Sequence, residues 1–346
     1  MKQERHATLY REYRPQSFAE VRGQEQVTDT LEKAIKNGKV AHAYLFAGSR
    51  GTGKTSVARI LAKALGVSDK DLYEIDAASN TGVDNIRELR EGVQTSPFDS
   101  KYKFYIIDEA HMLSRQAWNA LLKTLEEPPA HAIFVLATTE RDKVPETIQS
   151  RCEIYTFKQP AREILASVVS DVAKKEGYAL DTPAAELIAL LAEGSFRDSL
   201  SILQKVLAVS SGKKIDIADV EKVSGAPRGE LIRQLLSGIA KKDVALALGA
   251  IEEAVKQNLD ARTLAKLLIH RMRVVLLMRY APDLADEFSK EISAEDAVLA
   301  KEISKERGVN SDTLRALLDA YATMAYAAIP HLPLELAVID ICKTES

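Results

Sequence analysis

The sequence predicts an α/β fold, in which a parallel β-sheet domain with helices on both faces precedes an all-helical region. Short apolar runs alternate with helical patterns in the first half of the chain, as in a parallel sheet covered by helices. Runs such as Phe104–Ile107 are apolar without alternation, which is typical of strands buried on both faces. After Phe157 the β-like runs stop, and amphipathic helical spacing continues to about Lys343.

Five strands and three intervening helices are predicted in the first half. The strands are Tyr44–Ala47, Leu72–Asp76, Lys103–Asp108, Ile133–Ala137 and Ile154–Phe157. The helices are Thr55–Leu65, Val83–Thr95 and Gln116–Glu127. In the second half, a helical array from about Ala161 to Val223 precedes a second region that begins near Arg228. Gly225–Pro227 between them fits a hinge. Amphipathic blocks in the second region are Glu230–Ile239, Asp243–Lys256, Arg262–Arg279 and Asp312–Ala328.

Composition narrows the class of protein. The 346 residues suffice for two or three domains, and 46% hydrophobic and 28% charged residues are ordinary for a soluble globular protein. A net charge of −3 argues against a wholly basic nucleic-acid coat, although a local basic surface stays possible. Cys152 and Cys342 are too few for a disulfide framework or a four-cysteine zinc site. With a polar Met1–Tyr10 and no apolar run of roughly 20 residues, we expect a cytoplasmic protein with no membrane segment.

The strongest motif is a phosphate-binding loop. Residues Gly48 to Thr55 read GSRGTGKT and fit the pattern G-x-x-x-x-G-K-[ST], between a predicted strand and a predicted helix. The glycines allow backbone N–H groups to surround phosphates, and the helix N-terminus favours an anion. Lys54 supplies a positive charge to the phosphates, and the Thr55 hydroxyl is suited to Mg²⁺. The residues expected to bind the nucleotide here are Gly48, Ser49, Arg50, Gly51, Thr52, Gly53, Lys54, Thr55 and Ser56.

A pair of acidic residues ends the third predicted strand. Asp108 is predicted to hold Mg²⁺, and Glu109 to polarise the attacking water, because two adjacent acids near a core otherwise carry an unexplained cost. Thr138 and Thr139 close the next strand, where a hydroxyl can orient water or touch the γ-phosphate. The four residues from Asp108 to His111 also spell the DEAH box of a helicase class. A helicase needs a second α/β domain, however, and the rest of this chain is helical.

The residues around these motifs resemble the clamp-loader branch of the AAA+ ATPases, and in detail the bacterial gamma/tau subunits of DNA polymerase III. The resemblance is dense over about residues 8–205. It rests on Tyr13–Pro15, Phe18, Gly23–Gln24, His42–Phe46, His111–Ser114, Asn119–Pro129 and Ser150–Cys152. It implies a RecA-like AAA+ domain over residues 1–159, a helical lid over 160–224 and a helical oligomerisation collar over 225–346. Leu332–Ala337 is similar to the last collar helix.

The resemblance implies further roles. Val21 lies in a stretch similar to the one that packs on adenine, and Thr139 matches the first sensor position. Arg197 matches the second sensor, which reaches the γ-phosphate, and Ser195 can cap the helix that presents it. Arg151 matches an arginine finger that completes the ATP site of a neighbouring subunit. Glu109, Arg151, Lys54, Thr139 and Arg197 are therefore the expected catalytic residues.

This sequence departs from the family pattern at a place that concerns metal binding. Family members carry a four-cysteine zinc module after the phosphate-loop helix, whereas Leu65–Asp71 spans that gap directly here, so we expect ATP and Mg²⁺ but no zinc. The short gap also leaves open an archaeal-type replication factor C small subunit, and the ATP site alone leaves open an AAA+ remodeller that loads no clamp. A delta-prime subunit is disfavoured, because its phosphate loop is usually degenerate.

Partners are also implied by the resemblance. They are a sliding clamp, delta-like and delta-prime-like subunits, primed DNA, and further copies of the chain through the collar. Arg115, at the start of a helix, matches a position that contacts DNA phosphates, and Asn80 lies near the same surface in the family. Backbone contacts of this kind do not read sequence.

Overall fold

The computed structural model describes residues 8–79, 89, 91–210, 212–289, 291–306 and 308–343. The chain forms two compact units, one of residues 1–165 and 192–201 and one of residues 166–191 and 202–346. Each unit is described by itself. The boundaries predicted near residues 159 and 224 stay predictions. No helix in the described ranges is both long and apolar enough to cross a membrane.

The first unit contains a five-stranded parallel sheet in the order β2-β3-β4-β1-β5. The strands are β1 Ala43–Gly48, β2 Leu72–Asp76, β3 Lys103–Asp108, β4 Ala132–Thr138 and β5 Glu153–Phe157. The predicted α/β fold is confirmed, and each strand lies within one residue of its predicted bounds. Because all strands run the same way, the residues that follow β1, β3 and β4 meet at one edge of the sheet.

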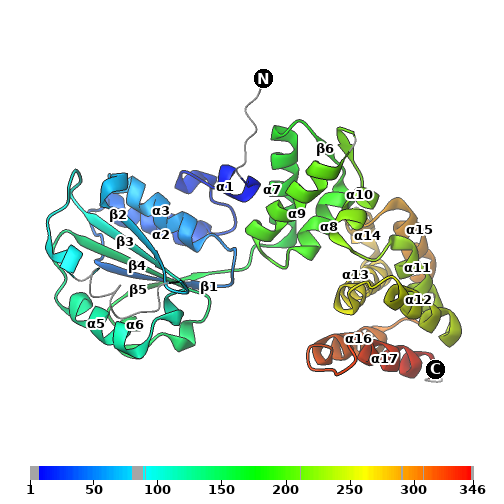
Figure 1. The fold of residues 1–346 in the computed structure, drawn as a ribbon. Coiled ribbons are helices and arrows are strands. Elements are labelled where there is room, and N and C mark those ends of the chain that lie inside the picture. The colour runs from blue at the N-terminus through cyan, green and yellow to red at the C-terminus, as the bar shows by residue number, and fades with distance from the viewer. Residues whose placement is uncertain are drawn as a thin grey trace. The chain divides into compact units, whose positions relative to one another are not determined.

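Helices cover both faces of this sheet (Figure 1). Helices α2 Glu25–Lys36 and α3 Lys54–Ala64 bury apolar side chains against one face, where Phe46 and Ile106 point. Helices α5 Arg115–Glu126 and α6 Glu146–Gln149 cover the other face through Trp118, Leu121 and Ile148. The predicted helix Val83–Thr95 lies largely outside the described residues. Short elements complete the unit: α1 Leu9–Glu12, η1 Phe18–Glu20, η2 Asp69–Asp71, η3 Ala110–Met112 and η4 Arg141–Lys143.

Four helices follow the sheet, in the region predicted to be helical. They are α7 Arg162–Lys175, α8 Thr182–Leu191, α9 Phe196–Val209 and α10 Ile217–Ser224. One difference from prediction is a pair of two-residue strands, β6 Ala179–Leu180 and β7 Lys214–Ile215, which pair in parallel. Strands this short carry no periodic signal, so the sequence pattern could not predict them.

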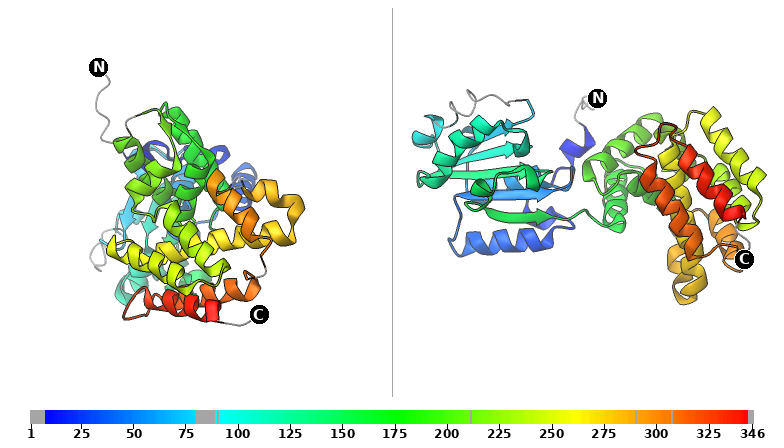
Figure 2. Two further views of the ribbon diagram at one scale, coloured as in Figure 1. Left: turned by 90° about the vertical axis from the view of Figure 1, so that its right-hand side faces the viewer. Right: turned by 90° about the horizontal axis from the view of Figure 1, so that it is seen from below.

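From residue 229 on, every element of the second unit in the described residues is a helix, as predicted. Its elements are α11 Gly229–Ala240, α12 Val244–Lys256, α13 Ala261–Tyr280, η5 Pro282–Leu284, α14 Ala285–Ser289, α15 Ala294–Ile303, α16 Ser311–Thr323 and α17 Leu332–Lys343. The last block ends at Thr323 and not at Ala328. Helices α16 and α17 lie side by side as a hairpin (Figure 2). Inside the unit, the buried Arg271 guanidinium is neutralised by Asp296, which contacts its Nη2 at 2.7 Å.

Candidate active site

The loop between β1 and α3 has the backbone shape that its glycines permit. Gly51 has a φ of 74°, and a Cβ on it would lie 2.0 Å from the Ser195 Oγ. A Cβ on Gly48 would lie 2.4 Å from the Phe157 carbonyl oxygen. Both approaches exclude any side chain. The loop therefore closes against Phe157 and Ser195 only because these two positions are glycine.

Lys54 lies inside this loop. Its Nζ donates hydrogen bonds to the carbonyl oxygens of Gly48 and Ser49, each at 2.8 Å. Burial lowers the pKa of Lys54, and the nearby carboxylates of Glu109 and Asp108 oppose that shift. A cation in a loop that begins a helix is suited to a polyphosphate.

Thr55 and Asp108 meet at the carboxyl edge of the sheet. The Thr55 hydroxyl, in the first turn of α3, donates to the Asp108 Oδ2 at 2.8 Å at the end of β3. A hydroxyl and a carboxylate oxygen so close together are hard ligands of the kind Mg²⁺ prefers. The donor set therefore fits a Mg²⁺–nucleotide complex, and the Gly48–Thr55 loop fits its phosphates.

Glu109 has a strained backbone beside this pair. Its φ of 48° places a non-glycine residue in the left-handed region, a conformation that costs energy and clusters at functional sites. The Thr139 hydroxyl donates to the Glu109 Oε2 at 3.2 Å, so β3 and β4 bring these two predicted residues together. Thr138 is fully buried and its hydroxyl lies 3.1 Å from His111 Nδ1, so Thr139 is the threonine that faces Glu109.

Gln24 belongs to the stretch that resembles an adenine-packing segment, but its contacts with the phosphate loop were not predicted. Its fully buried side chain donates to the carbonyls of Lys158 at 2.7 Å and Thr52 at 3.3 Å, and accepts from the Lys158 amide at 3.2 Å. It therefore joins the phosphate loop to the segment after β5. Val21, just before it, packs against the cluster that also holds Phe46. The only available signal was the Gly23-Gln24 pair itself.

Helix α9 begins at the phosphate loop. The Ser195 hydroxyl caps it by accepting from the Asp198 amide at 3.1 Å, as predicted, and the Phe196 amide donates to the Gly51 carbonyl at 3.0 Å. Arg197 is exposed in the first turn, and its guanidinium lies over the Tyr10 ring, 4.9 Å from the centroid. The structure thus brings the start of this helix to the loop, with Arg197 held by an aromatic ring.

Arg151 lies elsewhere. It precedes β5, whose first residue pairs with Tyr44 and whose last pairs with Gly48. Four residue steps of about 3.3 Å place the start of β5 about 13 Å from the phosphate-loop edge. The guanidinium donates to the Glu126 carboxylate and the Thr147 carbonyl, each at 2.7 Å. Arg151 is therefore not brought together with Lys54, Asp108 and Glu109 of its own chain.

The remaining predicted residues are placed as follows. Arg115 is exposed at the start of α5, a helix capped by Ser114 through the Ala117 amide. Asn80 lies outside the described residues. In the loop, Arg50 is exposed and Thr52 is buried, and Ser49 and Ser56 are intermediate. No cluster of three or more metal-ligating side chains occurs among the residues that the structure describes.

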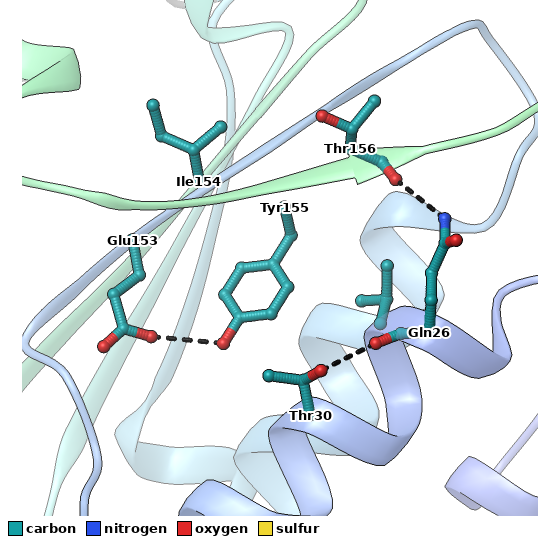
Figure 3. A pocket seen from close by; sticks show the side chains of 7 residues that line it. Gln26, Thr30, Glu153, Ile154, Tyr155 and Thr156 are labelled. Carbon is teal, nitrogen blue, oxygen red and sulfur yellow. Dashed lines mark hydrogen bonds between the residues drawn. The ribbon is translucent and has the colours of Figure 1, made fainter.

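A shallow hollow of about 520 Å³ lies along the edge strand β5. Figure 3 shows its lining, with Gln26 and Thr30 from α2 beside Tyr155 and Thr156 from β5. The Tyr155 hydroxyl donates to Glu153 at 3.1 Å, and Gln26 Nε2 donates to the Thr156 carbonyl at 3.5 Å. The hollow contains none of the predicted site residues, so the chemistry is assigned to the carboxyl edge of the sheet.

Comparison with protein families gives two matches. The model described as DNA polymerase III, delta subunit, matches residues 23–77 and 67–161. The model described as DNA polymerase III clamp loader subunit, ATPase lid domain, matches residues 164–212. Together the matches cover the sheet and helices α7, α8 and α9, and they end at residue 212.

Two curated relatives match most of the chain. The DNA polymerase III subunit tau of Bacillus subtilis is 38% identical over 97% of this chain and 63% of its own length. The subunit gamma/tau of Mycobacterium bovis is 37% identical over 94% of this chain and 59% of its own length. The chain thus spans about six tenths of the length of these relatives. These matches do not favour the archaeal alternative.

Among solved structures, the Thermotoga maritima RuvB Holliday junction branch migration motor is similar. It is 24% identical, with a TM-score of 0.53 over 66% of this chain and 79% of that one. This likeness shows the AAA+ fold alone.

Proposed function

The chain belongs to the gamma/tau family of DNA polymerase III clamp-loader subunits, and from this premise we propose that it is a clamp-loader ATPase. It binds and hydrolyses ATP to open a sliding clamp and place it on primed DNA. The observation that carries the proposal is the 2.8 Å contact between Thr55 and Asp108, with Lys54 and Glu109 beside it. That group of side chains is the set that phosphoryl transfer from ATP requires.

Each residue of the group has a separate task. The Lys54 ammonium exchanges the two loop carbonyls for the β- and γ-phosphate oxygens, while the loop amides bind the remaining phosphate charge. Glu109 accepts a proton from the water that attacks the γ-phosphorus, and the bond to the β-phosphate oxygen breaks, giving ADP and phosphate. The Thr139 hydroxyl orients Glu109, and Arg197 binds the γ-phosphate from helix α9.

Thr55 and Asp108 are the residues that would hold Mg²⁺. Bound by these two residues, Mg²⁺ would neutralise negative charge on the phosphate oxygens. Loss of either oxygen ligand should weaken this effect. Val21 would pack against the adenine ring near the loop.

The site is proposed to be shared between chains. Arg151 lies at the far end of the sheet from its own phosphate loop, where it contacts Glu126, and this distance supports a role at the ATP site of a neighbouring chain. A guanidinium suits this role because it stays charged and contacts two phosphate oxygens together. The collar would hold neighbours in register. Its last hairpin exposes apolar side chains, namely Leu318, Tyr326, Ile329, Leu332 and Leu336.

The complex would contain delta-like and delta-prime-like subunits and enclose primed DNA. Arg115 begins α5 on an exposed position, where its charge and the helix N-terminus favour a phosphate. Such contacts follow the DNA backbone without reading bases. ATP binding would bring subunits together around the clamp and DNA, and hydrolysis would release them.

Two substitutions test the ATPase. Lys54→Ala should keep the fold and lose ATP hydrolysis, because the charge on the phosphates is removed. Glu109→Gln should bind ATP with normal affinity and retain it, because only water activation is impaired. Both are measured by ATP binding and by turnover with clamp and primed DNA. Normal turnover in folded Lys54→Ala would refute the site, and turnover insensitive to clamp and DNA would refute the loader assignment.

A further inference from the structure

His111 lies directly beside Glu109, and the proposed function above gives it no role. Its side chain is only 7% exposed. The Nδ1 atom lies 3.5 Å from the Glu109 Oε2 and 3.1 Å from the Thr138 Oγ1, and the Nε2 atom lies 3.3 Å from the Glu140 Oε1. The ring therefore stands between the two carboxylates, in the short element η3 that follows β3.

We propose that His111 is a positioning residue for Glu109, which rests on the proposed role of Glu109 in ATP hydrolysis. Its Nδ1 edge and the Thr139 hydroxyl both face the same carboxylate oxygen, Oε2. A carboxylate held at one oxygen by two groups cannot rotate freely. The other oxygen is then kept in one direction for the attacking water.

Glu140 fixes the ring on its opposite edge. The Lys143 ammonium holds the Glu140 carboxylate at 2.8 Å, and the other oxygen of this carboxylate lies 3.3 Å from the His111 Nε2. The Glu140 backbone amide donates to the Thr138 hydroxyl oxygen at 3.0 Å, and the same oxygen lies 3.1 Å from Nδ1. The chain of contacts thus runs from Lys143 through Glu140 and His111 to Glu109.

This network connects the end of β4 to the end of β3. Thr138, Thr139 and Glu140 follow one another on the segment that closes β4, whereas Glu109 and His111 follow β3. A shift of the β4 end would move both holders of Glu109 at once. His111 therefore adds a second connection between the β4 end and Glu109, beside the direct Thr139 contact.

The test uses the full chain with ATP and Mg²⁺. His111→Leu removes both ring nitrogens at similar volume, and His111→Asn keeps a polar group near the Nδ1 position. His131→Leu is the matched control, because this partly buried histidine bonds the Val93 carbonyl at 2.9 Å and lies at the opposite end of β4. We measure ATP affinity, thermal unfolding and the single-turnover rate of hydrolysis.

His111→Leu should hydrolyse ATP about 10- to 100-fold more slowly with unchanged ATP affinity, because only the geometry of the reacting groups is lost. His111→Asn should recover part of the rate, and His131→Leu should match wild type. A normal rate in folded His111→Leu overturns the proposal. An equal loss of rate in His131→Leu would also overturn it. So would a loss of rate that parallels the loss of melting temperature in all three variants, since a packing role alone predicts both results.

The double variant with Glu109→Gln separates this inference from the function on which it rests. If His111 acts through Glu109, adding His111→Leu to Glu109→Gln should slow hydrolysis no further. An independent additional loss overturns the positioning role. A normal rate for Glu109→Gln alone would instead overturn the proposed role of Glu109, whichever result His111→Leu gives.

Discussion

Gly51 offers a direct test of how tightly the phosphate loop meets helix α9. In Gly51→Ala the added Cβ would lie 2.0 Å from the Ser195 Oγ and 2.9 Å from the Ser195 Cβ, at a backbone φ of 74°. Ser195 is buried and cannot move without giving up its cap on the Asp198 amide. Gly38→Ala is the matched control, because Gly38 has a φ of 66° and no atom within 4 Å of the added Cβ.

The two variants should differ in stability by the free energy that the clash between the added Cβ and Ser195 costs. A left-handed non-glycine residue costs about 1–2 kcal/mol, which both variants share. Gly51→Ala loses in addition the Ser195 cap, about 1 kcal/mol, and the Phe196–Gly51 backbone hydrogen bond, about 1 kcal/mol. For a unit of this size, each kcal/mol lowers the melting temperature by about 2–4 °C. Gly51→Ala should therefore melt about 4–8 °C below Gly38→Ala.

The assay is thermal unfolding of both variants, together with ATP binding. Gly51→Ala should also bind ATP more weakly, since the loop and the start of α9 are displaced together, whereas Gly38→Ala should bind normally. Ser195→Gly removes the clashing Oγ and Cβ, so adding it to Gly51→Ala should recover part of the lost stability. Equal melting of the two alanine variants, with equal ATP binding, would show that the loop does not close against Ser195.

Further predictions concern the arginine before β5, a buried carboxylate, the exposed face of α17 and zinc. Arg151→Ala should bind ATP but hydrolyse it about 10³-fold more slowly, and mixing it with Lys54→Ala should restore activity. Arg141→Ala is the control, because Arg141 is also exposed and its loss should leave the rate of hydrolysis unchanged. Mixed oligomers that show no recovery of activity would refute an arginine finger acting between chains. Burial alone would raise the pKa of Asp71, but the amides of Phe98, Asp99 and Ser100 lower it to about 2. Asp71→Asn should therefore have a lower melting temperature than wild type at neutral pH. The difference in melting temperature should shrink as the pH falls from about 4 toward 2, because wild type then loses the stability contributed by the ionised carboxylate. A difference independent of pH would contradict this reasoning. Leu336→Glu should reduce the assembly size in light scattering by charging an exposed apolar position of α17, and an unchanged size would place the contact elsewhere. Elemental analysis should find no stoichiometric zinc, and one zinc per chain would show that the Leu65–Asp71 gap was misread.

Local patterns predicted the elements that carry the site. The loop Gly48–Thr55 is recognisable in the sequence, because phosphate binding requires a particular backbone shape over a contiguous stretch of residues. Asp108 and Glu109 were predictable as site residues, because placing two acidic residues next to an apolar strand costs free energy that a functional role explains. The parallel order of strands then brings them to Thr55, as the 2.8 Å contact shows.

Contacts between distant parts of the chain were not predictable in this way. Gln24 bonds Lys158 across 134 positions, and nothing in either local segment indicates that pairing. His111 belongs to two motifs in the sequence, but its contacts were not predicted, because its two carboxylate neighbours come from different loops. Helix α16 also ends at Thr323, before the predicted end at Ala328, although the apolar block continues in the sequence. Tertiary packing decides such details, and one sequence does not encode them as a pattern.

Strand β5 is the last strand on one side of the sheet, and this edge has a consequence for solubility. An unpaired edge strand is a template on which another chain can add by backbone hydrogen bonding, and thereby aggregate. Strand β5 is short, begins with the charged Glu153, and has its Thr156 carbonyl already engaged by the Gln26 side chain. A single amide on α2 thus discourages unwanted strand addition. Gln26→Ala would free that carbonyl at the edge, and the expected cost is precipitation at high protein concentration with little loss of folded stability.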